Sequence, residues 1–373
     1  MKRISFLMMI FVLFVFACSD GEDNGIKDGG SDVLLTDPDV QKTGYAFIVN
    51  AAPDYKSATY SVMNLSDRSV SKDKDVIHTD AVARVFNNLI FVVSRLGADS
   101  ITILDPMKDF SVIKQFSVGA GSNPQDLSVY KDKIFVTKQN SAAIDVYSSS
   151  DYSKAGSIDI SKYADADGNA EAQDMIVYKD KLYVSVLRLD KNNYYAPTDK
   201  SYMLVIDPSS LKIEKEILLG ATNPFAGLVL DEENERILIA ETGSFGATDG
   251  RVEFYGIKEG FILQQIIPET SWGGDLNRIA YGNNKVFAVV SDSNFNTVLK
   301  AYDLVSAQMK SVYETKGFSI AGISVYANKE LYLCDRDMKK PGIRIFGIED
   351  LAQKTSDPID TGLPPVSLVF FSM

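Results

Sequence analysis

The chain has 373 residues, of which 45% are hydrophobic and 24% charged, so it is neither disordered throughout nor a multi-pass membrane protein. Its length suits two domains or one large β architecture. Acids outnumber bases 50 to 38, and the formal charge of −12 argues against nucleic acid as a partner. With one histidine, His78, and two cysteines, Cys18 and Cys334, the chain lacks the residues for a zinc finger, a three-histidine metal site or a disulfide scaffold.

The first 17 residues have the features of a signal peptide. Lys2 and Arg3 provide a positive start, and residues 4–17 are apolar apart from Ser5. A helix of this length falls short of a hydrocarbon core about 30 Å thick, which argues against a membrane-spanning segment. Residues 1–17 are therefore predicted to be a signal peptide.

This apolar run ends in Val15-Phe16-Ala17-Cys18, which resembles the bacterial lipobox. The resemblance implies cleavage before Cys18, lipidation of this cysteine and attachment to a membrane through the N-terminal lipid. Residues 18–42 are acidic, rich in glycine and free of aromatic residues, so they are predicted to be a flexible tether. The acidic run also resembles the surface-export signal of Bacteroidetes lipoproteins. That resemblance favours an outer-membrane lipoprotein on the cell surface over one on the periplasmic leaflet.

From residue 43 onward, one pattern recurs seven times. Each copy has an alternating apolar run, a short polar turn, a second run with an apolar anchor residue, a polar loop and a third run. The anchors are 44 to 55 positions apart, and they are Phe47, Phe91, Phe135, Tyr183, Leu238, Phe287 and Tyr332. Period-2 alternation with β-branched and aromatic residues predicts strands. A period near 47 with three or four short strands per copy predicts a β-propeller, whose radially stacked sheets cover each other.

The two ends of the repeat region are complementary. The first copy, GYAFIVNAAPDYKSATYSVMNL, begins at the second strand, and residues 363–371, LPPVSLVFF, match the first-strand pattern NPQDLSVY. We therefore expect residues 43–373 to form an all-β, seven-bladed propeller closed by the C-terminal strand pairing with the N-terminal blade. This pairing removes a free sheet edge.

The unit NPQDLSVYKDKIFVTKQNSAAIDVYSSSDYSKAGSIDI, residues 123–160, resembles the YVTN/YncE-type propeller repeat. The resemblance covers residues 43–373 and implies the fold, with no single activity. Longer stretches such as LLGATNPF and VVSDSNFNT resemble bacterial propeller lipoproteins without an assigned activity. Related folds include secreted binding proteins, lactonases and haem-d1 enzymes, so the fold alone does not choose a function.

In a propeller, the loops that lead into the innermost strands share one face with the loops that join second to third strands. Four innermost strands begin near an aspartate: Asp80, Asp126, Asp174 and Asp275. Two other copies have Ala226-Gly227 and Ala321-Gly322 there instead. Two interpretations are open. The four carboxylates ring the channel mouth and hold a cation or a basic ligand group, or each caps its own loop through backbone N–H groups.

Arginines accompany these aspartates. Arg95, Arg188 and Arg336 follow the second-strand anchors by four or five residues, and Arg84 and Arg278 lie on innermost strands. Arginines in this setting either form ion pairs with the aspartates or grip a carboxylate or phosphate of a ligand. We therefore count Arg95, Arg188 and Arg336 as candidate ligand-binding residues.

Aromatic residues gather in the same loops, namely Tyr194, Tyr195, Phe225, Phe245, Trp272, Phe295 and Phe318. Loop aromatics flanked by glycine, asparagine and serine are typical of recognition surfaces, and packing of long loops onto the rim is the alternative. Trp272 lies between Ser271 and Gly273-Gly274 and is the only tryptophan. We expect it, with Tyr194 and Tyr195, to be accessible to a ligand.

The alternating oxygen side chains of Asp165, Asp167, Asn169 and Glu171 resemble a calcium loop. The glycine and the bidentate glutamate of an EF-hand are missing, so calcium is one hypothesis and an Asx-turn loop is the other. A catalytic triad would have to use His78, and no G-x-S-x-G motif is present. Cys334 is predicted to be a buried apolar residue.

These features predict a lipid-anchored envelope propeller that binds a ligand or protein partner through one loop face without catalysis. Surface propeller lipoproteins that capture a corrinoid for a TonB-dependent transporter are similar in anchor, tether and blade count. A lactonase- or lyase-type enzyme is a second hypothesis, and a structural envelope scaffold is a third. An enzyme predicts convergent carboxylates in the channel, a ligand trap predicts a broad aromatic surface, and a scaffold predicts neither.

Overall fold

The computed structural model describes residues 44–373. The predicted signal peptide, the lipid attachment at Cys18 and the tether of residues 18–42 lie outside the described residues. Within the described part, no helix is long and apolar enough to span a membrane.

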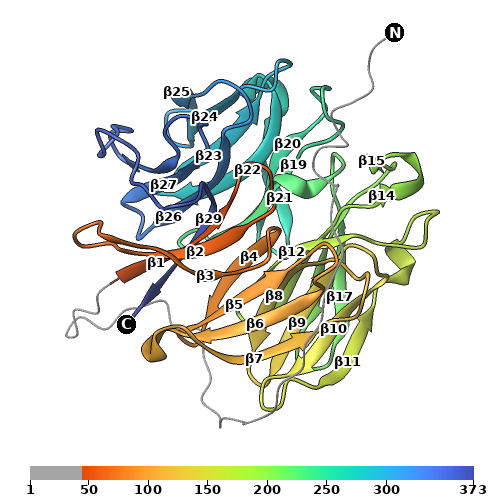
Figure 1. Cartoon of the computed structure of the whole chain (residues 1–373). Helices are drawn as coiled ribbons and strands as arrows, with labels where there is room; N and C mark the ends of the chain where they lie inside the picture. Colours follow the sequence, from red (N-terminus) through yellow and green to blue (C-terminus); the bar gives the residue numbers. More distant parts are fainter. Residues whose placement is uncertain (1–43) are drawn as a thin grey trace.

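Seven antiparallel sheets make up the molecule, as predicted (Figure 1). The innermost strands are β4 (Ala81–Phe86), β8 (Pro124–Tyr130), β12 (Ala172–Tyr178), β18 (Gly227–Asp231), β22 (Asp275–Gly282), β26 (Ile320–Tyr326) and β29 (Pro365–Ser372). The second strands are β1 (Gly44–Ala51), β5 (Leu89–Ser94), β9 (Lys133–Lys138), β13 (Lys181–Val186), β19 (Arg236–Glu241), β23 (Lys285–Ser291) and β27 (Glu330–Asp335). Each second strand carries one predicted anchor, and all seven anchors are at most 5% exposed.

The outer half of each blade is more polar. The third strands are β2 (Ala58–Asn64), β6 (Ser100–Asp105), β10 (Ala143–Ser148), β16 (Tyr202–Asp207), β20 (Arg251–Gly256), β24 (Thr297–Asp303) and β28 (Gly342–Gly347). The outermost strands are β3 (Val70–Val76), β7 (Ser111–Ser117), β11 (Lys154–Asp159), β17 (Lys212–Leu218), β21 (Ile262–Pro268) and β25 (Gln308–Glu314). A small hairpin, β14 (Leu189–Asp190) with β15 (Ala196–Pro197), and one short helix, α1 (Glu269–Trp272), lie in connections between strands.

The ring closes as the sequence predicts. β29 pairs antiparallel with β1, with Phe47 opposite Val369 and Ile48 opposite Leu368, so the C-terminal strand is the innermost strand of the N-terminal blade (Figure 1). The last blade has three strands, and the segment after β28 folds back beside it. Ile343 and Ile359 exchange backbone hydrogen bonds of 2.9 and 2.8 Å there. This segment occupies the place of an outermost strand.

Strand direction fixes which connections share a face. In every antiparallel blade, the second-to-third connection and the connection from the outermost strand to the next innermost strand lie at the same end. We call this end the loop face. Hydrogen bonds join these connections across blades: Leu96 N donates to Asn123 Oδ1 (3.2 Å), and Arg336 Nη1 donates to the carbonyl of Ala51 (3.1 Å).

Candidate functional site

Large apolar side chains gather on the loop face. Tyr194, in the β13–β16 connection, is 81% exposed. The other exposed members lie in further loop-face connections, and with Tyr194 they form a set that we call the apolar rim: Tyr55, Tyr194, Phe245, Phe295, Phe318 and Met338. The opposite face has exposed apolar residues too, such as Met107 and Val305, and so do the outermost strands. The rim is distinct because six side chains project from one set of connections.

Four rim residues were candidates from the sequence, namely Tyr194, Phe245, Phe295 and Phe318. Tyr55 and Met338 were missed, although each is the one large apolar residue in a polar second-to-third connection. Tyr195 and Phe225 are half-buried, and the Phe225 ring meets the Phe245 ring edge-on at 6.4 Å.

Trp272 corrects one expectation. It is 0% exposed and packs in the hydrophobic core between β18–β21 and β22–β25, against Leu276, Val290 and Tyr302. It ends α1, and Gly273 follows with a left-handed φ of 74°, which turns the chain while the indole points inward. The glycines beside Trp272 therefore reflect a tight turn rather than an accessible loop.

The three candidate arginines all have protein partners. Arg95 donates to Asp80 Oδ1 through Nε (2.9 Å) and to Gln125 Oε1 through Nη1 (3.2 Å). Arg188 Nη1 donates to Asp199 Oδ1 at 3.0 Å. Arg336 donates to backbone carbonyls of the first blade, and its guanidinium lies over the Tyr55 ring at 5.1 Å. These arginines hold loop-face connections in place, and ligand contact by them remains a prediction.

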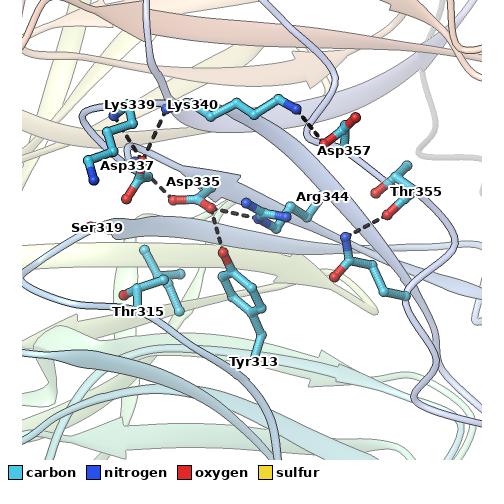
Figure 2. Close-up of polar contacts among 12 residues, drawn as sticks. Tyr313, Thr315, Ser319, Asp335, Asp337, Lys339, Lys340, Arg344, Thr355 and Asp357 are labelled. Atoms are coloured by element: carbon cyan, nitrogen blue, oxygen red, sulfur yellow. Dashed lines mark hydrogen bonds and ion pairs between the residues drawn. The ribbon is translucent and has the colours of Figure 1, made fainter.

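The last blade shows how firmly such connections are held (Figure 2). Asp335 is fully buried, and its Oδ2 accepts from Arg344 Nε (2.6 Å) and from the Tyr313 hydroxyl (2.9 Å). Its Oδ1 accepts from the Asp337 N–H at 2.9 Å, and Asp337 in turn accepts from the backbone N–H groups of Lys339 and Lys340. One buried carboxylate thus joins two neighbouring blades and orders the β27–β28 connection.

The four candidate aspartates do not form one ring. Asp275 accepts from the Gly246 N–H (3.0 Å to each oxygen), so it caps a loop, and Asp80 faces Arg95. Only Asp126 and Asp174 share an equivalent place on their innermost strands. Asp275 was wrongly aligned because it lies twelve positions before its anchor Phe287, whereas Asp126 and Asp174 each lie nine positions before theirs. The innermost strands β8, β12, β22 and β26 all carry a bulge at the equivalent place, and in β22 the residue after the bulge is Arg278.

The pairing registers identify the true equivalents. On each innermost strand, one residue lies opposite the position two after the anchor, at a common height in the channel. We call these seven residues the channel tier, and they are Ser367, Val82, Asp126, Asp174, Gly227, Arg278 and Gly322. The charged members of the tier are therefore Asp126, Asp174 and Arg278.

Asp126 is neutralised within the protein. Arg84, which lies two positions beyond the tier residue Val82 on β4, places its Nε 2.7 Å from Asp126 Oδ1. The other carboxylate oxygen accepts from the Met175 N–H at 3.0 Å. Burial raises the pKa of Asp126, and the Arg84 guanidinium opposes this shift. Asp126 and Arg84 thus form a closed pair in the channel wall.

Arg278 and Asp174 are different, because neither has an ion-pair partner or a side-chain hydrogen bond among residues 44–373. Both are partly exposed. Burial lowers the pKa of Arg278; Asp174 opposes that shift, and the charges of Arg84 and Arg95 add to it. Asp174 and Arg278 therefore attract each other across the channel without a direct ion pair, and Arg84 also attracts Asp174. We call Asp174 and Arg278 unmatched only in the sense that neither side chain has a direct partner among residues 44–373.

The hypothetical calcium loop is closed by its own backbone. Asp165 Oδ1 accepts from the Asp167 N–H (2.9 Å), Asp167 Oδ1 from the Asn169 N–H (2.8 Å), and Glu171 Oε2 from the Leu189 N–H (3.0 Å). Within residues 44–373, no three histidine, cysteine, aspartate or glutamate side chains are placed to hold one metal ion. These backbone contacts are those of an Asx-turn loop, and calcium binding by this loop remains a prediction.

His78 and Cys334 play local roles. The Asp80 N–H donates to His78 Nδ1 at 3.2 Å, which closes the turn before β4. Cys334 is a free, fully buried thiol in β27, and burial raises its pKa, as expected for a cysteine that packs as an apolar residue.

Comparison with known proteins supports the class of protein that this fold defines, a seven-bladed β-propeller. No protein-family model and no curated protein sequence matches the chain. Among solved structures, a periplasmic gluconolactonase of Pseudomonas aeruginosa is similar at a TM-score of 0.60 and 14% identity, over 88% of this chain and 99% of that chain.

Two further structures are similar in the same way. A protein from Lactobacillus plantarum has a TM-score of 0.62 and 9% identity, with 89% of this chain and 100% of that chain covered. A chain of hydrazine synthase from Kuenenia stuttgartiensis has a TM-score of 0.58 and 12% identity, with 84% and 98% covered. At such low identities, these likenesses show the fold alone.

Proposed function

We propose that the chain is a lipid-anchored envelope propeller that captures a ligand or protein partner on its loop face without catalysing a reaction. The observation that carries the proposal is the apolar rim, six large side chains exposed on loop-face connections, one of which, β27–β28, is ordered by the buried Asp335 carboxylate. Exposed aromatic clusters mark interaction sites, and rigid loops lose little entropy on binding.

The anchored part of the proposal rests on the sequence. The lipobox-like segment that ends at Cys18 and the acidic residues after it support attachment to the outer membrane with the propeller held away from it. In its nutrient-capture form, the ligand is a large planar amphiphile such as a corrinoid, and the partner is a TonB-dependent transporter. The breadth of the rim, which extends over connections of at least five blades, supports a large partner or ligand.

Site-specific photo-crosslinking tests the loop face. A benzophenone amino acid is placed at Phe245 or Met338 on the rim, and at Met107 or Val305 on the opposite face as exposed controls. In intact cells, we expect a defined adduct from the rim positions and none from the controls. Equal adducts on both faces, or adducts from the controls alone, would place the interaction elsewhere.

Cys18→Ala tests the anchor. Loss of the lipid should move the protein from the detergent phase to the aqueous phase or block its processing, because the acyl chains that insert into detergent or membrane are then missing. Phase partitioning and the mass of the mature protein measure this. Full detergent partitioning with an unchanged mature mass would contradict the lipid assignment.

A further inference from the structure

The unmatched charges of the channel tier are separated by glycine. Around the ring, the tier residues run in the order Asp174, Gly227, Arg278 and Gly322, from β12, β18, β22 and β26. Gly322 allows the backbone of β29 to approach β26 closely, because a Cβ at this position would lie 2.7 Å from Val366 O. A Cβ at Gly227 would lie 3.5 Å from Ile279 Cγ1 and 3.9 Å from Asp174 Oδ2, so this missing side chain opens the space between the carboxylate and β22.

An apolar cavity lies further along the innermost strands than these charges. It has a volume of about 330 Å³ and lies in the half of the channel remote from the loop face, between β18, β22, β26 and β29. Its wall includes Val229, Ile279, Tyr281, Val325, Leu368 and Phe370. Ile279 follows Arg278 directly and also lies beside Gly227, so the cavity begins where the charged tier ends.

The charge pattern selects the ligand. A simple anion would match Arg278 but leave Asp174 uncompensated, and a simple cation would do the reverse. A molecule that carries both charges close together satisfies the two groups at once, and each charge-assisted hydrogen bond is stronger than a neutral one. The size of the cavity, at the lower end of the roughly 300–1,000 Å³ typical of small-molecule pockets, suits one compact apolar group.

We infer that the channel binds a free α-amino acid with a large apolar side chain. Its carboxylate meets Arg278, its ammonium group meets Asp174, and its side chain enters the cavity beside Ile279. Arg84 and Asp126 stay paired with each other and form the wall behind Asp174. This site lies within the channel and does not depend on the proposed role of the apolar rim.

Calorimetric titration of the full-length protein in mild detergent with L-phenylalanine tests the inference. We expect saturable one-to-one binding. Three matched compounds each lack one feature: 3-phenylpropanoate lacks the ammonium group, phenylalaninamide lacks the carboxylate, and glycine lacks the apolar side chain. Each should bind about tenfold more weakly or worse, because one charge or the apolar contact is left unmatched.

Variants tie the selectivity to the two residues. Asp174→Asn should remove the preference for phenylalanine over 3-phenylpropanoate, and Arg278→Gln should remove the preference over phenylalaninamide. If Arg278→Gln unfolds, Arg278→Lys serves as a second variant. Because it keeps the positive charge, it should retain the preference for phenylalanine over phenylalaninamide. Phe245→Ala, on the rim, should leave phenylalanine binding unchanged even if it abolishes the loop-face interaction.

Several outcomes would overturn the inference. These are no saturable heat with L-phenylalanine up to about 10 mM, equal binding of the three truncated compounds, or unchanged selectivity in Asp174→Asn and Arg278→Gln proteins that unfold at the parent midpoint.

Discussion

Two connections of the loop face carry aromatic residues beside small or polar neighbours, yet one aromatic side chain is exposed and the other is buried. In the β13–β16 connection, Tyr194 projects into solvent, whereas in the β21–β22 connection Trp272 is wholly buried. The difference follows from what each connection spans. A second-to-third connection returns within one blade, whereas an outermost-to-innermost connection crosses to the next blade and passes over the apolar interface between the two sheets.

The same contrast holds for carboxylates. Glu269 in the β21–β22 connection is 0% exposed, and its oxygens accept from the N–H groups of Gly250 (2.8 Å) and Leu276 (2.9 Å). Glu171 in the β11–β12 connection is likewise buried and accepts from the Leu189 N–H. The β11–β12 and β21–β22 connections between blades thus carry stability, whereas five of the six rim residues lie in connections within blades; Phe318, in the β25–β26 connection, is the exception.

The largest test of this contrast is Trp272→Ala. Removing a buried indole from the interface between two blades should lower the free energy of unfolding by about 3–5 kcal/mol. Chemical denaturation followed by far-ultraviolet circular dichroism measures the change. A loss below about 1 kcal/mol would show that the connection between blades is not packed as described.

The repeat made the architecture predictable. Each copy supplies its own alternating strands. The seven anchors, from Phe47 to Tyr332, are buried because both faces of each blade pack against adjacent blades. The closure was predictable because the first copy lacks a first strand and the last residues supply one. These are properties of composition and period, which a sequence displays directly.

The channel was harder to predict because the register of each innermost strand decides which side chain lies at the tier. Asp275 lies twelve positions before Phe287, whereas Asp126 lies nine positions before Phe135, so Arg278 and not Asp275 reaches the tier. Counting nine positions back from the anchors Phe91, Phe135, Tyr183 and Phe287 gives Val82, Asp126, Asp174 and Arg278. Trp272 could not be placed from its neighbours, because glycines serve buried turns and exposed loops equally.

A smaller effect is expected from the pH dependence of Glu269. Burial raises its pKa from 4.5 to about 7, although the N–H groups of Leu276 and Gly250 oppose the shift. Between these two pH values the folded state binds more protons than the unfolded state, so the free energy of unfolding falls as pH rises. Glu269→Gln should reduce this fall by on the order of 1–3 kcal/mol.

Denaturation curves at pH 4.5, 6 and 7.5 measure how far the free energy of unfolding falls with pH in the parent and in Glu269→Gln. Burial raises the pKa of Glu171 to about 8. The free energy of unfolding of the variant should therefore still fall with pH, but over a higher pH range than in the parent. Identical pH profiles for the parent and Glu269→Gln would contradict a buried, titrating Glu269.

The smallest expected effect is that of Tyr194→Ala. Its side chain is 81% exposed and follows a short 3₁₀ turn, Lys191–Asn193, that Asp190 caps through the Asn192 N–H at 2.9 Å. The cap does not involve the Tyr194 side chain, so the free energy of unfolding should change by less than about 0.5 kcal/mol. Binding should respond instead, because truncating an interface tyrosine often costs about 2 kcal/mol, roughly thirtyfold in affinity. The adduct yield from a benzophenone at Phe245 reports this loss, and a yield unchanged by Tyr194→Ala would remove Tyr194 from the recognition surface while leaving its neighbours on the rim in place.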